Sequence, residues 1–159
     1  MQKGNPPVEA YRYLGRAQLG IGHYDPAQKT LESGIARYGD DAELFDILGA
    51  VHMTRAFAAA QYSATEEALD AFNRSLALDA HRATTHYNLG LLYSYRDSTV
   101  LAEKFYQSAL AIDSTLAPAH KKLGMYYRKK GALDLALSHL HQAARYAPQD
   151  GEVHFHLGL

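Results

Sequence analysis

The chain has no cysteine among its 159 residues. This absence excludes disulfide bonds, thiolate metal sites and thiol nucleophiles, although it does not identify the compartment. An excess of one charge is also missing, because 16 Lys and Arg residues stand against 17 Asp and Glu residues. This balance gives no global field that would attract nucleic acid or an acidic membrane. Any electrostatic effect must therefore be local.

Long hydrophobic runs are absent as well, since no stretch approaches the roughly 18 apolar residues of a transmembrane helix. The sequence also lacks a phosphate-binding P-loop, a Gly-x-Ser-x-Gly nucleophile elbow and a His-Glu-x-x-His zinc motif. We therefore expect a soluble chain that does not insert into a membrane and binds no nucleic acid. We expect neither an enzyme nor a bound cofactor or metal.

Leu-Gly pairs recur along the chain at a regular distance. Successive pairs are 34, 41, 34 and 34 residues apart, and they are Leu14-Gly15, Leu48-Gly49, Leu89-Gly90, Leu123-Gly124 and Leu157-Gly158. A period of this size indicates a stack of supersecondary units. Glycine inside a helix costs about 1 kcal/mol relative to alanine. Its recurrence at one position in all five pairs predicts that two helices pack closely there.

Each unit contains two helix-like apolar patterns separated by a break. The units begin at Val8, Ala42, Ala83, Ala117 and Gly151. In the second pattern of each unit, apolar or small residues recur at i, i+4 and i+7, which places them on one helical face. These trios are Ala27, Leu31 and Gly34; Ala68, Phe72 and Ser75; Ala102, Tyr106 and Ala109; and Ala136, Leu140 and Ala143.

The pattern resembles the tetratricopeptide repeat (TPR) family, a 34-residue helix-turn-helix unit with an aromatic residue, Leu-Gly, Tyr, Ala, Phe, Ala and Pro at set offsets. The resemblance covers residues 8 to 159 and implies an all-α fold, a right-handed superhelical solenoid. We expect one domain, 1–159, with repeats 8–41, 42–82, 83–116 and 117–150 and a partial fifth repeat, 151–159. The family's aromatic position holds Tyr11, Phe45, His86, His120 and His154.

The resemblance also implies a concave groove, lined by the first helix of each repeat, that binds peptides. The residues carried over to the groove are Arg12, Tyr13, Arg16, Asp46, Tyr87, Asn88, Leu91, Tyr95, Lys121, Lys122, Met125 and Arg128. The family's carboxylate clamp is incomplete, because Asp46, Ala50 and Pro118 occupy three of its positions. What remains is an amide, apolar surface and cations that can pair with acidic side chains.

We therefore predict a noncatalytic scaffold that binds an extended or helical, acidic segment of a partner protein. An alternative is self-association through residues 151–159, since half a repeat would leave an apolar edge. A weaker alternative is the targeting arm of a larger enzyme. The half-written fifth unit leads us to expect a fragment of a longer chain, whose compartment the sequence does not indicate.

The second repeat is seven residues longer than the others, with the excess near 54–67. Seven residues are about two helical turns. We expect the first helix to continue through Ala58 to Ala60 and a capping box, Ser63 to Glu66, to open the next. Phe57 and Tyr62 then either fold back on neighbouring repeats or form a second partner surface.

Nine histidines invite a metal-site interpretation. The pairs His139-Leu140-His141 and His154-Phe155-His156 have i, i+2 spacing, which places two rings on roughly opposite sides of a helix, whereas helical zinc pairs use i, i+4. We therefore expect the histidines at the aromatic position to pack between helices with one ring nitrogen hydrogen-bonded.

Overall fold

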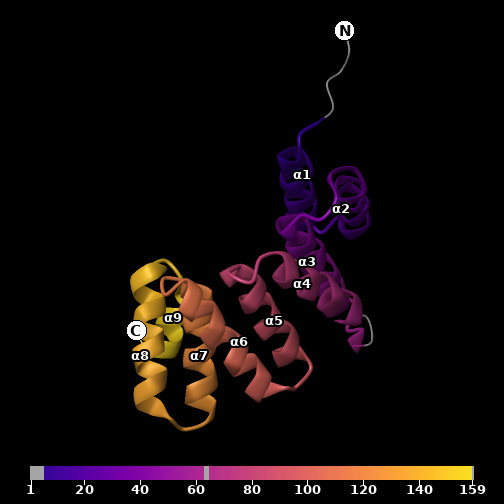
Figure 1. Cartoon of the computed structure of the whole chain (residues 1–159). Coiled ribbons are helices and arrows are strands. Elements are labelled where there is room, and N and C mark those ends of the chain that lie inside the picture. The colour runs from indigo at the N-terminus through magenta and orange to yellow at the C-terminus, as the bar shows by residue number, and fades with distance from the viewer. Residues whose placement is uncertain (1–5, 63–64, 159) are drawn as a thin grey trace. The chain divides into compact units, whose positions relative to one another are not determined.

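The computed structural model describes residues 6–62 and 65–158, and these residues form nine α-helices and no strand (Figure 1). The helices are α1 (Val8–Gly20), α2 (Tyr24–Tyr38), α3 (Ala42–Ala58), α4 (Thr65–Leu78), α5 (Ala83–Tyr95), α6 (Thr99–Ile112), α7 (Ala117–Lys129), α8 (Leu133–Tyr146) and α9 (Gly151–Leu157). The prediction of an all-α fold built from helix-turn-helix units is confirmed.

The helices group into two compact units, Met1–His81 with α1 to α4 and Arg82–Leu159 with α5 to α9. In the first unit the core contains Ala27, Leu31, Leu44, Ile47, Leu48, Val51 and Ala71. In the second unit a core cluster contains Ala102, Tyr106, Leu123, Tyr127 and Ala136. Each unit thus has its own core, and the single domain 1–159 stays a prediction.

Four of the five recurring glycines lie against a large side chain of the paired helix. A Cβ atom on Gly15, Gly49, Gly90 or Gly124 would lie 2.6, 2.6, 2.4 or 2.7 Å from the nearest atom of Leu31, Phe72, Tyr106 or Leu140, respectively. No side chain other than hydrogen fits at such distances. The predicted close packing is therefore confirmed at these four positions.

The same prediction is not tested at Gly158, because no described helix follows α9 to pack against it. A Cβ there would meet no described atom within 4 Å, and the residue has a φ of 77°. Gly158 is the C-cap of α9 and lies just past its last helical residue. In this structure it has the left-handed conformation, which glycine adopts without steric penalty.

The helices pair as α1 with α2, α3 with α4, α5 with α6 and α7 with α8, and the first helix of each pair ends in the same way. A residue with positive φ follows the helix, and the next N–H donates to the carbonyl five residues earlier, as in a Schellman motif. The left-handed residues are Gly22, Ala60, Asp97 and Gly131, and the bonds are His23 to Gln18, Gln61 to Ala56, Ser98 to Tyr93 and Ala132 to Tyr127, at 2.9 to 3.0 Å.

This ending corrects the prediction for the insertion. Because Ala60 is left-handed, α3 stops at Ala58 and does not continue through Ala60. With 17 residues, α3 is still about one turn longer than α1, α5 and α7, which have 13 each. Ser63 and Ala64, which would open the predicted capping box, lie outside the described residues; α4 begins at Thr65, whose hydroxyl donates to the Tyr62 carbonyl at 2.8 Å.

We predict that Gly90→Ala lowers the free energy of unfolding by about 1–3 kcal/mol, because the new methyl group would overlap the Tyr106 ring. The matched control is Gly20→Ala at the end of α1, where a Cβ meets no described atom within 4 Å. That change should be neutral or stabilise by up to about 1 kcal/mol, as helix propensity favours alanine. Urea denaturation measures both, and equal effects would contradict the close-packing argument.

Candidate functional site

The residues predicted to line the groove lie on the first helices of the pairs. Arg12, Tyr13 and Arg16 are on α1 and Asp46 is on α3, so all four belong to the first unit. The other eight belong to the second unit, with Tyr87, Asn88, Leu91 and Tyr95 on α5 and Lys121, Lys122, Met125 and Arg128 on α7. The predicted groove residues therefore form two sets, one in each unit.

Both predicted cations of the first unit are paired with acids on or next to α3. The Arg12 guanidinium forms an ion pair with Asp41, with Nε 3.2 Å from Oδ1, and its Nη1 lies 3.3 Å from Glu43. Arg16 Nη2 lies 2.7 Å from Glu43 Oε1. The hydrogen bond to Asp41 raises the pKa of Arg12. These arginines thus join α1 to the start of α3. Of the other two residues, Tyr13 is exposed and Asp46 is buried.

Lys121 repeats this arrangement in the second unit. Its Nζ lies 2.8 Å from Asp150 Oδ2 and 2.9 Å from Glu152 Oε2, so it joins α7 to the start of α9. Asp41 and Asp150 are also the N-caps of α3 and α9, and each accepts a backbone N–H of the helix that it opens. Burial acts to lower the pKa of Lys121, but hydrogen bonds to the two carboxylates outweigh it and raise the pKa.

Three other cations of α7 are not used in this way. Lys122, Arg128 and Lys129 form no ion pair and no side-chain hydrogen bond with any residue in the described part of the chain, and Lys122 acts on Glu152 only at longer range. Lys130 differs from them, because its Nζ lies 3.5 Å from Glu103 and 4.6 Å from the centre of the Tyr126 ring.

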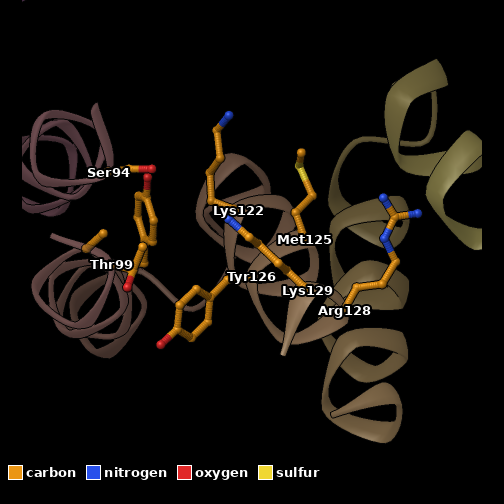
Figure 2. A pocket seen from close by; sticks show the side chains of 9 residues that line it. Ser94, Thr99, Lys122, Met125, Tyr126, Arg128 and Lys129 are labelled. Atoms are coloured by element: carbon orange, nitrogen blue, oxygen red, sulfur yellow. The ribbon is translucent and has the colours of Figure 1, made fainter. Parts of the chain in front are cut away.

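These three cations border a surface depression of about 490 Å³, which we call the α7 pocket. It is lined by Ser94, Thr99, Ala102, Tyr106, Lys122, Met125, Tyr126, Arg128 and Lys129. Figure 2 shows Ser94 and Thr99 on one side and Lys122, Met125 and Arg128 across from them on α7. The pocket thus joins hydroxyl groups from α5, α6 and α7 with cations of α7, and no acid lines it.

Of the predicted groove residues, the α7 pocket brings together Lys122, Met125 and Arg128. It also contains residues of α6 that the sequence reasoning missed, because the carried-over positions lie only on first helices. One signal was available: Tyr106 is the residue of its trio that corresponds to Leu31, Phe72 and Leu140, and it alone has a hydroxyl group.

The predicted residues of α5 are half-buried. Tyr87 and Leu91 pack against the core of the second unit, and the Tyr87 ring lies 5.8 Å from that of Tyr106. Burial raises the pKa of Tyr87. Asn88 and Tyr95 are also half-buried. For the second predicted surface, Phe57 is half-buried and Tyr62 is 51% exposed; its role as a partner surface stays a prediction.

The histidines at the aromatic position pack as expected in two repeats. His120 Nε2 lies 3.1 Å from the Ser114 carbonyl and His154 Nε2 lies 2.8 Å from the Pro148 carbonyl, so each ring donates to the loop before its own helix. This fixes the neutral His120 with Nδ1 as an acceptor, and Nδ1 of His139 lies 3.0 Å from it. The Nδ1–H group of His139 therefore donates to Nδ1 of His120.

Among the described residues, no three His, Asp or Glu side chains are arranged to hold a metal ion. No described helix combines the length and the apolar character needed to span a membrane.

We predict that Lys121→Met and Lys122→Met differ in their effect on stability. The first removes two ion pairs and should lower the free energy of unfolding by about 0.5–1 kcal/mol, since the carboxylates are partly exposed. The second removes no pair and should change it by less than about 0.5 kcal/mol. Thermal denaturation distinguishes the two, and a larger loss for Lys122→Met would show that Lys122 is structural.

We also predict that the protein loses stability as the pH falls below about 6.5, the pKa of histidine in an unfolded chain. Burial, followed by the charge of a protonated His120, lowers the pKa of His139, and burial lowers that of His52. The unfolded chain then binds protons more readily than the folded one, so acid favours unfolding.

Urea denaturation at about pH 7.5 and about pH 5.5 measures this loss. His139→Gln should reduce the difference between the two conditions, while His141→Gln, an exposed position on the same helix, should not. An unchanged difference in His139→Gln would exclude His139 as its source.

Comparison with protein-family models gave no match, and neither did comparison with curated protein sequences. Solved structures are similar over nearly the whole chain. The TPR protein TTC0263 of Thermus thermophilus is 23% identical with a TM-score of 0.84, over 99% of this chain and 85% of that one. PilF of Pseudomonas aeruginosa is 17% identical with a TM-score of 0.80, over 94% of this chain and 65% of that one.

YrrB, described as a TPR protein with an unusual peptide-binding site, is 19% identical with a TM-score of 0.67, over 96% of this chain and 75% of that one. At these identities the likeness concerns the fold. The paired helices, the four glycine contacts and these structural neighbours together show that the chain has the tetratricopeptide-repeat fold.

Proposed function

We propose that this chain is a noncatalytic protein-interaction scaffold that binds an acidic segment of a partner protein on the first helices α5 and α7 of the second unit, with the α7 pocket as its main cationic contact. The observation that carries the proposal is the division among the cations. Arg12, Arg16 and Lys121 pair with acids of their own chain, whereas Lys122, Arg128 and Lys129 pair with none of the described residues.

The physical reason is that a cation already held between two carboxylates attracts a third only weakly, because the charges nearly cancel. A cluster of unpaired cations keeps its field and can steer and hold an acidic partner. Met125 adds apolar surface beside the charges. The chemistry therefore suits a segment that alternates acidic and apolar side chains.

Two structural neighbours agree with this class of function. YrrB is described as having an unusual peptide-binding site, and a chain of the APC/C hetero-tetramer Cut9–Hcn1 is 24% identical with a TM-score of 0.77, over 95% of this chain and 29% of that one. TPR proteins in general act as protein-interaction scaffolds, which supports a binding rather than a catalytic role.

Self-association through residues 151–159 is retained as a second candidate, because Phe155 on α9 is 74% exposed. Molar mass measured by light scattering over a range of concentrations separates the two. A constant monomer mass would remove self-association, and a mass that rises with concentration and returns to the monomer value in Phe155→Ser would support it.

We predict that Lys122→Glu combined with Arg128→Glu weakens binding of a fluorescein-labelled peptide of alternating Glu and Ala by about tenfold or more at low salt. The difference should shrink at high salt, where charges are screened. The matched control, Lys29→Glu with Lys104→Glu, makes the same change in net charge at exposed positions outside the pocket. Fluorescence anisotropy measures both, and equal weakening in the control would exclude the α7 pocket as the binding site.

A further inference from the structure

Tyr106 has a hydroxyl group that packing does not require. It occupies the place that Leu31, Phe72 and Leu140 hold in the other three pairs, facing the recurring glycine. Phe72 lies against Gly49 much as Tyr106 lies against Gly90, with the ring 2.6 and 2.4 Å, respectively, from a Cβ built on the glycine. An aromatic ring without a hydroxyl therefore fills this place in the same fold.

The hydroxyl is also buried. Tyr106 is only 4% exposed, and its oxygen makes no well-formed hydrogen bond with a described residue. Burial, followed by the neighbouring Tyr87, raises the pKa of Tyr106; the nearby Ser94 hydroxyl acts to lower the pKa but does not outweigh them, so the group stays protonated and is a donor. A buried donor without a good acceptor destabilises a protein. Such a group is expected where a ligand supplies the acceptor.

The surroundings indicate which acceptor fits. Tyr106 lines the α7 pocket together with Lys122 and Lys129, and no acid lines this pocket. A carboxylate has two oxygens that accept several hydrogen bonds, and its negative charge supplies the ion-pair partner that the two lysines lack. Ala102 and Met125 offer apolar surface to the methylene groups of the same side chain.

We propose that the α7 pocket is a receptor for one acidic side chain, Glu or Asp, of the bound segment, and that the Tyr106 hydroxyl donates a hydrogen bond to its carboxylate. This inference rests on the proposed function and adds to it: binding is selective through a buried donor and not only through surface charge. Lys122 and Lys129 attract the negative charge at the rim of the pocket. The Tyr106 hydroxyl adds a hydrogen bond that only a group with an acceptor oxygen inside the pocket can accept.

The test is Tyr106→Phe, which removes one oxygen atom and keeps the ring against Gly90. We expect its affinity for the labelled Glu-Ala peptide to fall about tenfold, the loss that follows from one hydrogen bond to a charged group. We expect its melting temperature to stay the same or rise, because a buried donor without a good acceptor is gone. The peptide of alternating Gln and Ala should bind weakly to both proteins.

Tyr127→Phe is the matched control, since the Tyr127 hydroxyl donates to Glu103 at 2.7 Å and lies outside the pocket lining. It should lower the melting temperature and leave peptide binding unchanged. If Tyr106→Phe instead lowers the melting temperature as Tyr127→Phe does, and leaves binding intact, the hydroxyl serves the fold and the inference is overturned.

The remaining outcomes separate the inference from the proposed function. Wild-type affinity in Tyr106→Phe, combined with loss of binding in the Lys122→Glu, Arg128→Glu variant, would overturn the receptor and leave the charged surface standing. Failure of the unmodified protein to bind the Glu-Ala peptide would overturn both. Loss of affinity in Tyr106→Phe without loss of thermal stability supports the receptor.

Discussion

The close approach between the two helices of each pair depends on the missing Cβ of one glycine. At Gly15, Gly49, Gly90 and Gly124 the opposing side chain occupies the space that a methyl group would need. The buried residues Leu31, Phe72, Tyr106 and Leu140 owe their position to this contact. A single pair of helices buries little apolar surface by itself. How closely its two helices approach therefore sets how much apolar surface the pair removes from water.

The charges follow a second rule, which concerns the junction between consecutive pairs. A cation at the fifth position of a first helix, Arg12 or Lys121, reaches the N-cap aspartate and the following glutamate of the next first helix. Arg12 and Lys121 thus stabilise the junctions between pairs of helices, and the cations without an acidic partner among the described residues remain able to bind another molecule. The proposed binding surface is accordingly narrower than the basic run 121–130 suggests.

Periodicity predicted most of the fold, because a 34-residue repeat and a 3.6-residue period both leave direct traces in the order of residues. The first helix of each repeat begins where the sequence predicted the repeat to begin, at Val8, Ala42, Ala83, Ala117 and Gly151. The end of α3 could not be predicted, since alanine gives no sign that Ala60 is left-handed. The candidate site was predicted only in part for a related reason. Whether Lys121 or the adjacent Lys122 meets Asp150 depends on side-chain directions that helical spacing alone does not resolve.

The capping aspartates have a consequence for how the chain assembles. The Asp150 carboxylate accepts the N–H groups that open α9 and also receives Lys121 from the preceding pair; Asp41 does the same for α3 and Arg12. Starting the new helix and docking it on the previous pair thus use the same carboxylate at these junctions. A folded neighbour that holds the capping carboxylate in place therefore favours initiation of the next helix, which adds cooperativity to a linear array whose coupling is limited to nearest neighbours.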